Sequence, residues 1–218
     1  MAYSSMMTRC AWAVVTASLA LAGCGSEPAK KEEAPKKTAE KAPEVYKVQM
    51  DTSKGAVVIE VHREWAPFGA DHFYNLVKTG FYDNARFFRV VRNFVVQFGI
   101  AANPDTQRLW ETAVLVDDPV EQHNTRGMVT YAKRGPNTRS TQIFINLRDN
   151  RQALDSQGFA PFGKVVEGMD VVDSFYSSYG DMPPQGEGPD PKQIQLRGNE
   201  YLESRFPRLD YIKRATVQ

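Results

Sequence analysis

Two runs of apolar residues, Phe87–Val91 and Phe94–Phe98, flank the polar pair Arg92-Asn93. Their β-branched and aromatic residues predict two strands joined by a tight connection. Each run also contains one polar side chain, Arg89 in the first and Gln97 in the second. The N–H donors of these side chains cost free energy if they are buried without partners. Two interpretations remain open: the polar groups face solvent from a half-buried sheet, or they belong to a binding site.

Similar patterns predict further short strands and few helices. A helix is expected from Pro67 to just before Gly80, because Phe68, Phe73 and Leu76 recur at helical spacing. A shorter helix is predicted over Gly168–Tyr176, and a helical turn or two over Gly198–Arg205. The other predicted strands are Val45–Asp51, Ala56–Val61, Gly127–Lys133, Gln142–Leu147, Phe159–Val166 and Leu209–Val217. About eight short strands with two substantial helices are typical of a mainly β, closed or nearly closed barrel.

Three stretches between these elements are predicted to be loops. Ile100–Arg126 has an irregular pattern, Ala153–Gly158 is short and polar, and Gly180–Pro191 is rich in Gly and Pro.

Residues 1–24 are predicted to be a bacterial lipoprotein signal peptide. Arg9 supplies the positive charge, an uncharged apolar segment of small residues follows, and the segment ends in Leu21-Ala22-Gly23-Cys24. This ending resembles a lipobox, in which cleavage leaves Cys24 as a lipid-modified first residue. The alternative is a chance run of small residues. Gly25 is not the Asp associated with inner-membrane retention, so the outer membrane or the periplasmic face is the expected location.

Residues 25–44 are expected to form a solvated tether. They are almost exclusively Ala, Lys, Glu and Pro, with five Lys balanced by five Glu, and they have no apolar face to bury. Residues 45–218 then form a single domain.

Composition excludes several classes of function. The 218-residue chain has a formal net charge of +1 and no basic cluster in its globular part, which argues against a nucleic-acid partner. The folded region lacks cysteine, so it offers no thiol for a disulfide, a metal or a nucleophile. The adjacent pair Asp117-Asp118 precedes a proline and has too few further ligands to indicate a metal site. His123 has no Ser or Cys partner in a known motif. No cofactor or metal is expected, and the chain is expected to be a monomer.

Three segments carry a resemblance to a known family. Phe87–Gly99, Gly127–Ile145 and Phe162–Asp170 resemble, in order and spacing, the motifs of the cyclophilin-type peptidyl-prolyl isomerases, and the similarity covers about residues 45–217. The resemblance implies an eight-stranded antiparallel barrel that is closed and capped by two helices. It also implies a peptide groove on the outside of the barrel.

The resemblance assigns a role to individual residues. Arg89 matches the catalytic arginine, and Gln97 matches the glutamine that binds substrate backbone and helps to hold the arginine. The remaining matches are substrate-binding: Phe94, Phe144 and Leu154 as walls of the proline pocket, Ala132 and Lys133 as backbone groups, and Gln142 along the groove. Val95 and Phe159 are also expected to bind substrate. From the sequence alone, the barrel core would be the favoured place for Phe94 and Phe144, and the resemblance reverses that preference.

The chain departs from the family pattern at four positions. Val95 stands where a Met is common, and Lys133 replaces a common Asn. Ala153 falls where many members have Trp, and Phe159 where many have His, so that edge of the pocket lacks two polar groups.

The sequence therefore predicts a lipid-anchored cyclophilin of the bacterial cell envelope that isomerises Xaa-Pro bonds in unfolded or mobile segments of envelope proteins. The alternative is a cyclophilin-fold module that binds proline-containing segments with little turnover. Retention of both Arg89 and Gln97 favours the enzyme, because a binding module could lose the buried donor.

We expect weak inhibition by the cyclic peptide cyclosporin, because Ala153 and Phe159 remove two polar contacts from the pocket edge. The measurement is inhibition of the isomerisation of a short Xaa-Pro peptide. Nanomolar inhibition would contradict this assignment of the pocket edge.

Overall fold

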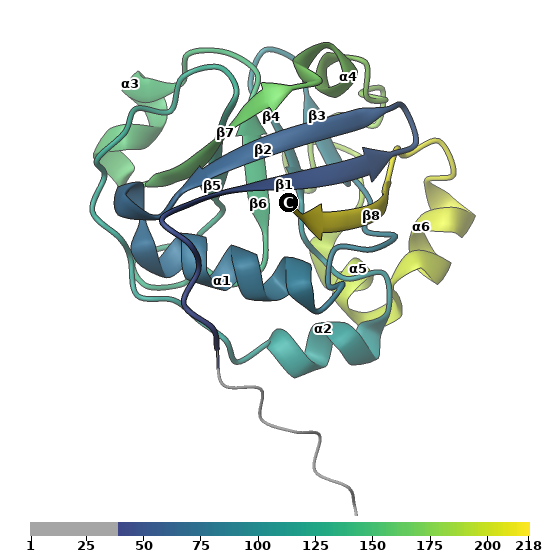
Figure 1. Ribbon diagram of the computed structural model, residues 1–218. Helices are drawn as coiled ribbons and strands as arrows, with labels where there is room; N and C mark the ends of the chain where they lie inside the picture. The colour runs from purple at the N-terminus through teal and green to yellow at the C-terminus, as the bar shows by residue number, and fades with distance from the viewer. Residues whose placement is uncertain (1–38) are drawn as a thin grey trace, which may run out of the picture. The chain divides into compact units, whose positions relative to one another are not determined.

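The computed structural model describes residues 39–218 (Figure 1). The predicted signal peptide, its Cys24, and residues 25–38 of the predicted tether lie outside the described residues.

Eight strands form one antiparallel sheet, as predicted, in the order β3-β4-β6-β5-β7-β2-β1-β8. The strands begin and end close to the predicted positions. In chain order they are β1 (Val45–Thr52), β2 (Ala56–His62), β3 (Arg89–Val91), β4 (Val95–Phe98), β5 (Met128–Tyr131), β6 (Ile143–Asn146), β7 (Pro161–Glu167) and β8 (Ile212–Val217).

The sheet curls into a barrel, but the prediction of a closed barrel was too strong. The edge strands β3 and β8 do not pair with each other along their length. One isolated bridge, between Arg86 and Tyr211, joins the segments that flank them. Backbone hydrogen bonds from Asn84 to Ile212 and from Phe87 to Asp210 complete the contact. A half-barrel held by this seam is therefore the accurate description.

Helices lie at both ends of the barrel and along one side (Figure 1). The expected helix is α1, which begins with Pro67 at its first turn and ends at Lys78. None of the helices in residues 39–218 is both long and apolar enough to span a bilayer. The other helical segments are α2 (Pro104–Trp110), α3 (Arg151–Leu154), α4 (Met169–Asp173), α5 (Pro191–Arg197), α6 (Asn199–Arg205) and the short 3-10 turns η1 (Arg63–Trp65) and η2 (Asp155–Gln157).

Three of these helices, α2, α3 and α5, were not predicted. The Ile100–Arg126 stretch was expected to be mostly loop, but it contains α2, and the predicted loop Ala153–Gly158 contains the end of α3 and η2. Helices α2 and α5 each begin with an Asx residue followed by proline, and the Asx side chain caps the helix. Asn103 accepts a hydrogen bond from the Asp105 N–H, and Asp190 accepts one from the Lys192 N–H. This cap signal was present in the sequence and outweighed the turn-like composition.

The barrel interior is filled by side chains. Phe73 of α1 packs on Phe162 of β7 and on Tyr82, with ring centroids 5.1 and 5.5 Å apart. Phe98 of β4 contacts Tyr82 from another side. These side chains are fully buried, so the interior is a packed core. A ligand must therefore bind on the outer surface.

The domain begins before Val45, contrary to the predicted boundary. Ala42 is only 4 % exposed, and its N–H donates to Asp71 on α1 over 2.9 Å. Glu40 exchanges hydrogen bonds with Asn75, also on α1, and its carboxylate lies 2.6 Å from Lys78 Nζ. The last residues of the predicted tether are thus part of the folded domain.

Candidate active site

A groove of about 630 Å³ lies on the outer surface of the sheet, beside strands β4 and β6. Its apolar floor is a small cluster separate from the barrel core. Val95, Phe144 and Leu154 form the buried part of this cluster, and Phe94, Ala132 and Phe159 pack against it. An apolar, partly open floor of this kind suits a compact apolar ring.

Strand alternation explains why neighbouring residues divide between the core and the groove. In β4, Val96 and Phe98 belong to the barrel core, whereas Val95 and Gln97 face the groove. The register places Gln97 opposite both Arg89 of β3 and Phe144 of β6. Both faces of β4 are covered, so its residues are all buried and show no polar alternation. This is why the sequence could not separate core from pocket.

A chain of polar side chains crosses the groove. Arg89 Nη1 donates to Gln97 Oε1 over 3.0 Å, and Gln97 Nε2 donates to Gln142 Oε1 over 3.0 Å. The guanidinium carbon of Arg89 also lies 5.5 Å from the ring centroid of Phe94. The donors of Arg89 are therefore held at the edge of the apolar floor.

Sequence reasoning missed the strongest partner of Arg89. Asp181, in the loop before α5, accepts from Arg89 Nε over 2.7 Å and from Nη2 over 3.1 Å. Burial raises the pKa of Asp181, but the hydrogen bonds from Arg89 outweigh burial and place the pKa below its ordinary value. The two residues are far apart in the chain, and no local pattern indicated this pair.

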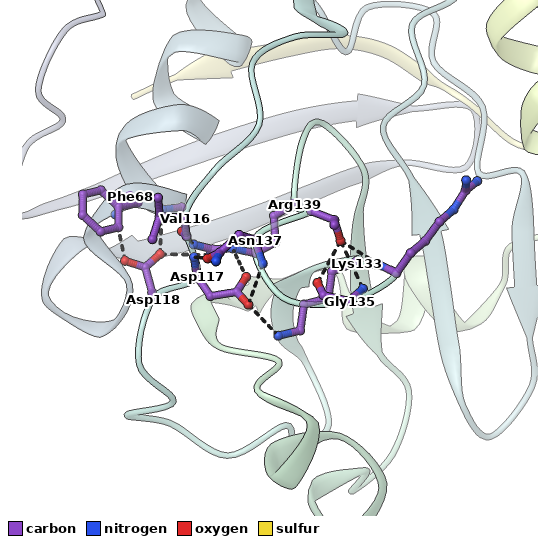
Figure 2. A network of polar contacts seen from close by, with 11 residues as sticks. Phe68, Val116, Asp117, Asp118, Lys133, Gly135, Asn137 and Arg139 are labelled. Carbon is purple, nitrogen blue, oxygen red and sulfur yellow. Dashed lines mark hydrogen bonds and ion pairs between the residues drawn. The ribbon is translucent and has the colours of Figure 1, made fainter.

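A second charged network anchors the opposite side of the groove (Figure 2). Lys133, at the end of β5, has a side chain only 7 % exposed, and its Nζ lies 2.9 Å from Asp117 Oδ2. Burial raises the pKa of Asp117, but hydrogen bonds from Lys133 and from the Asn137 N–H outweigh burial and lower it. Lys133 Nζ also lies 5.5 Å from the Phe159 ring centroid. The ammonium group thus faces the network as well as the pocket.

Arg139 links this network to helix α1. Its Nη1 donates to Asp118 Oδ2 over 2.9 Å, and its Nε lies 3.2 Å from Asp117 Oδ1. Asp118 also accepts the N–H groups of Phe68 and Gly69 at the first turn of α1. The side chains of Arg139 and Asp118 are 2 % and 0 % exposed. The Asp117-Asp118 pair therefore binds protein cations and N–H groups.

Two histidines, His72 and His123, do not line the groove. Burial lowers the pKa of His72 to about 4, and its ring packs beside Trp110 and Tyr131. His72 is therefore neutral near pH 7. His123 Nδ1 lies 2.7 Å from Asp155 Oδ2. Neither arrangement indicates acid–base chemistry at the groove.

The structure brings all ten residues named from the family motifs to one groove, although their roles remain predictions. They are Arg89, Phe94, Val95, Gln97, Ala132, Lys133, Gln142, Phe144, Leu154 and Phe159. Residues that were not named also line it, and they come from α5, η2 and the loops: Glu111, Val114, Arg134, Thr138, Ser140, Gln157, Met182, Pro191 and Gln195.

A family model described as cyclophilin type peptidyl-prolyl cis-trans isomerase matches residues 47–195, which is more than half of the chain. The chain belongs to this family. Its enzyme class follows, so this cyclophilin is a peptidyl-prolyl cis-trans isomerase, and the alternative of a binding module is disfavoured.

Named bacterial relatives support the assignment. A peptidyl-prolyl cis-trans isomerase of Acinetobacter baylyi is 35 % identical over 130 residues, which cover 58 % of this chain and 69 % of the relative. Peptidyl-prolyl cis-trans isomerase B of Escherichia coli is 32 % identical over 133 residues, covering 58 % of this chain and 81 % of the relative.

Solved structures support the fold. A Cryptosporidium parvum cyclophilin type peptidyl-prolyl cis-trans isomerase superposes with a TM-score of 0.58 at 20 % identity, covering 80 % of this chain and 98 % of that chain. The crystal structure of the same isomerase in the presence of the dipeptide Ala-Pro superposes with a TM-score of 0.57 at 19 % identity, covering 79 % and 98 %.

We predict that Asp118→Ala lowers the free energy of unfolding by about 3–5 kcal/mol, because it removes the fully buried carboxylate that accepts from Arg139 Nη1 and from the N–H groups of Phe68 and Gly69. Urea unfolding measures the loss. The matched control is Asp173→Ala, which removes an exposed carboxylate paired with Arg126, both about half exposed. The control should cost less than about 1 kcal/mol. Equal losses for the two variants would contradict a structural role for the buried pair.

Proposed function

We propose that this cyclophilin isomerises Xaa-Pro bonds by holding the proline ring on the apolar floor of the groove while Arg89 donates to the amide nitrogen as the bond twists. The observation that supports this proposal is the number of Arg89 N–H groups that have no protein acceptor within residues 39–218. Three of its five N–H groups are engaged by Asp181 and Gln97, which leaves two for a substrate.

The physics of the reaction requires a donor at this place. Rotation about a peptide bond meets a barrier of about 18–20 kcal/mol, because resonance gives the C–N bond partial double-bond character. As the amide twists, the nitrogen regains its lone pair and becomes a hydrogen-bond acceptor. A donor fixed at that position stabilises the transition state more than either ground state. No bond is broken, so no acid, base or nucleophile is needed.

The rest of the groove supports binding of an extended peptide. The Cryptosporidium isomerase was crystallised in the presence of a short proline-containing peptide, the dipeptide Ala-Pro. In this chain the Ala132 N–H already donates to the Gln142 carbonyl over 2.9 Å. The backbone of a bound peptide would therefore contact the other backbone groups of Ala132 and Lys133. The pocket floor of Phe94, Val95 and Phe144 would hold the ring.

We further propose that the enzyme acts on envelope proteins from a membrane anchor. The support is the sequence Leu21-Ala22-Gly23-Cys24 and the uncharged apolar segment before it. Residues 25–38 would separate a lipidated Cys24 from the folded domain, since the residues from Glu40 onward contact α1.

We expect Arg89→Ala to lower kcat/KM for a short Xaa-Pro peptide by about 10²–10³-fold, the usual effect of removing one donor aimed at developing charge. Arg89→Lys should lose most of the activity as well, because an ammonium group cannot reproduce the fork that binds Asp181 and Gln97 together. The cis-to-trans rate of the peptide measures both effects.

Arg92→Ala is the matched control, because Arg92 is an exposed arginine in the turn after β3 and does not line the groove. It should leave the rate unchanged. A folded Arg89→Ala that keeps the wild-type rate would rule out the proposed role of Arg89. A folded wild type that binds the peptide without changing its rate would favour recognition over catalysis.

We expect Cys24→Ser, expressed in a bacterium, to abolish incorporation of labelled fatty acid and to release the protein from the membrane fraction. The other cysteine of the chain provides the control, since Cys10 lies within the predicted signal peptide, and Cys10→Ser should retain the label. An unlabelled wild type, or a labelled Cys24→Ser, would show that the lipobox assignment is wrong.

A further inference from the structure

The proposed mechanism gives no role to Asp181, the carboxylate that binds Arg89 at the groove. Arg89 uses its Nε–H and one Nη2–H on the two carboxylate oxygens of Asp181. Such a bidentate contact fixes the plane of the guanidinium as well as its position. The third nitrogen of the guanidinium, Nη1, is held by a hydrogen bond to Gln97. Because Asp181 and Gln97 hold the guanidinium, they also set the direction in which its two remaining N–H groups point.

The loop is built to hold the Asp181 carboxylate in place. The Met182 N–H donates to Asp181 Oδ1 over 2.8 Å, and the Gly188 N–H donates to the Asp181 carbonyl over 2.9 Å. A Cβ on Gly186 or Gly188 would lie 2.3 or 2.7 Å from that carbonyl oxygen. Only glycine permits this close approach at both positions. The backbone of the loop therefore packs tightly on the backbone of Asp181.

A separate apolar cluster anchors the loop to the barrel. Tyr179 and Met182 pack against a buried group that contains Phe88, the neighbour of Arg89, and Ile194 of α5. Met182 also lines the groove. The residues on either side of Asp181 in this loop are thus packed on a cluster that includes Phe88, directly before strand β3.

We propose that Asp181 is a positioning residue for the isomerase reaction, which holds the Arg89 guanidinium in the orientation that catalysis requires. This inference rests on the proposed role of Arg89. A long arginine side chain held only by Gln97 would sample other rotamers, so fewer molecules would have a donor at the twisting nitrogen. Removal of Asp181 should therefore lower kcat more than it changes KM, because the apolar floor remains.

The alternative role of Asp181 is inhibition. A carboxylate bound to the guanidinium competes with the substrate for donors and offsets its charge. If that effect dominated, removing Asp181 would raise activity. The direction of the change therefore separates the two roles.

The test compares Asp181→Ala and Asp181→Asn in the full chain, with a short Xaa-Pro peptide as substrate. We expect kcat to fall about tenfold for Asp181→Ala and less for Asp181→Asn, which keeps one acceptor oxygen of the same size and place. The Arg89 Nε–H signal in NMR should exchange faster with solvent in both variants. Glu187→Gln is the control, because it removes one negative charge from an exposed position in the same loop.

The outcomes distinguish this inference from the proposed function. Loss of activity in Arg89→Ala and in both Asp181 variants, with Glu187→Gln unchanged, would support it. Loss in Arg89→Ala with unchanged or higher activity in folded Asp181→Ala would overturn it and leave the proposed function standing. A folded Arg89→Ala with full activity would overturn both. If Asp181→Ala does not fold, Asp181→Asn decides by the same criteria.

Discussion

The filled interior of the barrel is the constraint on which the rest of this structure depends. Phe73, Phe98 and Phe162 meet inside the sheet and leave no room for a ligand. The chemistry must therefore be performed on the outer surface, in the groove beside β4 and β6. Because strand side chains alternate, each of these strands contributes to the core and to the groove at once. Core packing thus sets the geometry of the site.

Two charged contacts hold the two sides of the groove. On one side Asp181 fixes Arg89, and on the other side the buried pair of Arg139 and Asp118 joins the groove to the first turn of α1. A buried ion pair such as that of Arg139 and Asp118 adds little net stability over apolar residues. Each of the two contacts nevertheless joins chain segments that are far apart in the sequence. We interpret both contacts as devices that fix loops from distant parts of the sequence.

A rigid groove suits a reaction that only rotates a bond. The substrate changes shape within the site, and the protein must offer a fixed donor and a fixed ring pocket while it does so. In the mechanism that we propose, the donor is Arg89, which is hydrogen-bonded to Gln97, and Gln97 in turn is hydrogen-bonded to Gln142. The residues of the groove floor beside Arg89 are apolar, so little water competes with a substrate for its N–H groups. The neutral His72 and the paired His123 lie elsewhere, consistent with a reaction that needs no proton transfer.

The sequence by itself determined the features whose signals are local. Alternation and runs of β-branched and aromatic residues predicted the strands, and Pro67 and helical spacing predicted α1. The family motifs named ten residues that meet in one groove. Cap signals before α2 and α5 were also present, but turn-like composition concealed them. The tertiary structure alone decided the open seam of the barrel, the packing of Ala42 on α1, and the partner of Arg89. Each of these depends on the path of the chain between distant segments, and a long-range ion pair leaves no periodic pattern in the residues around it.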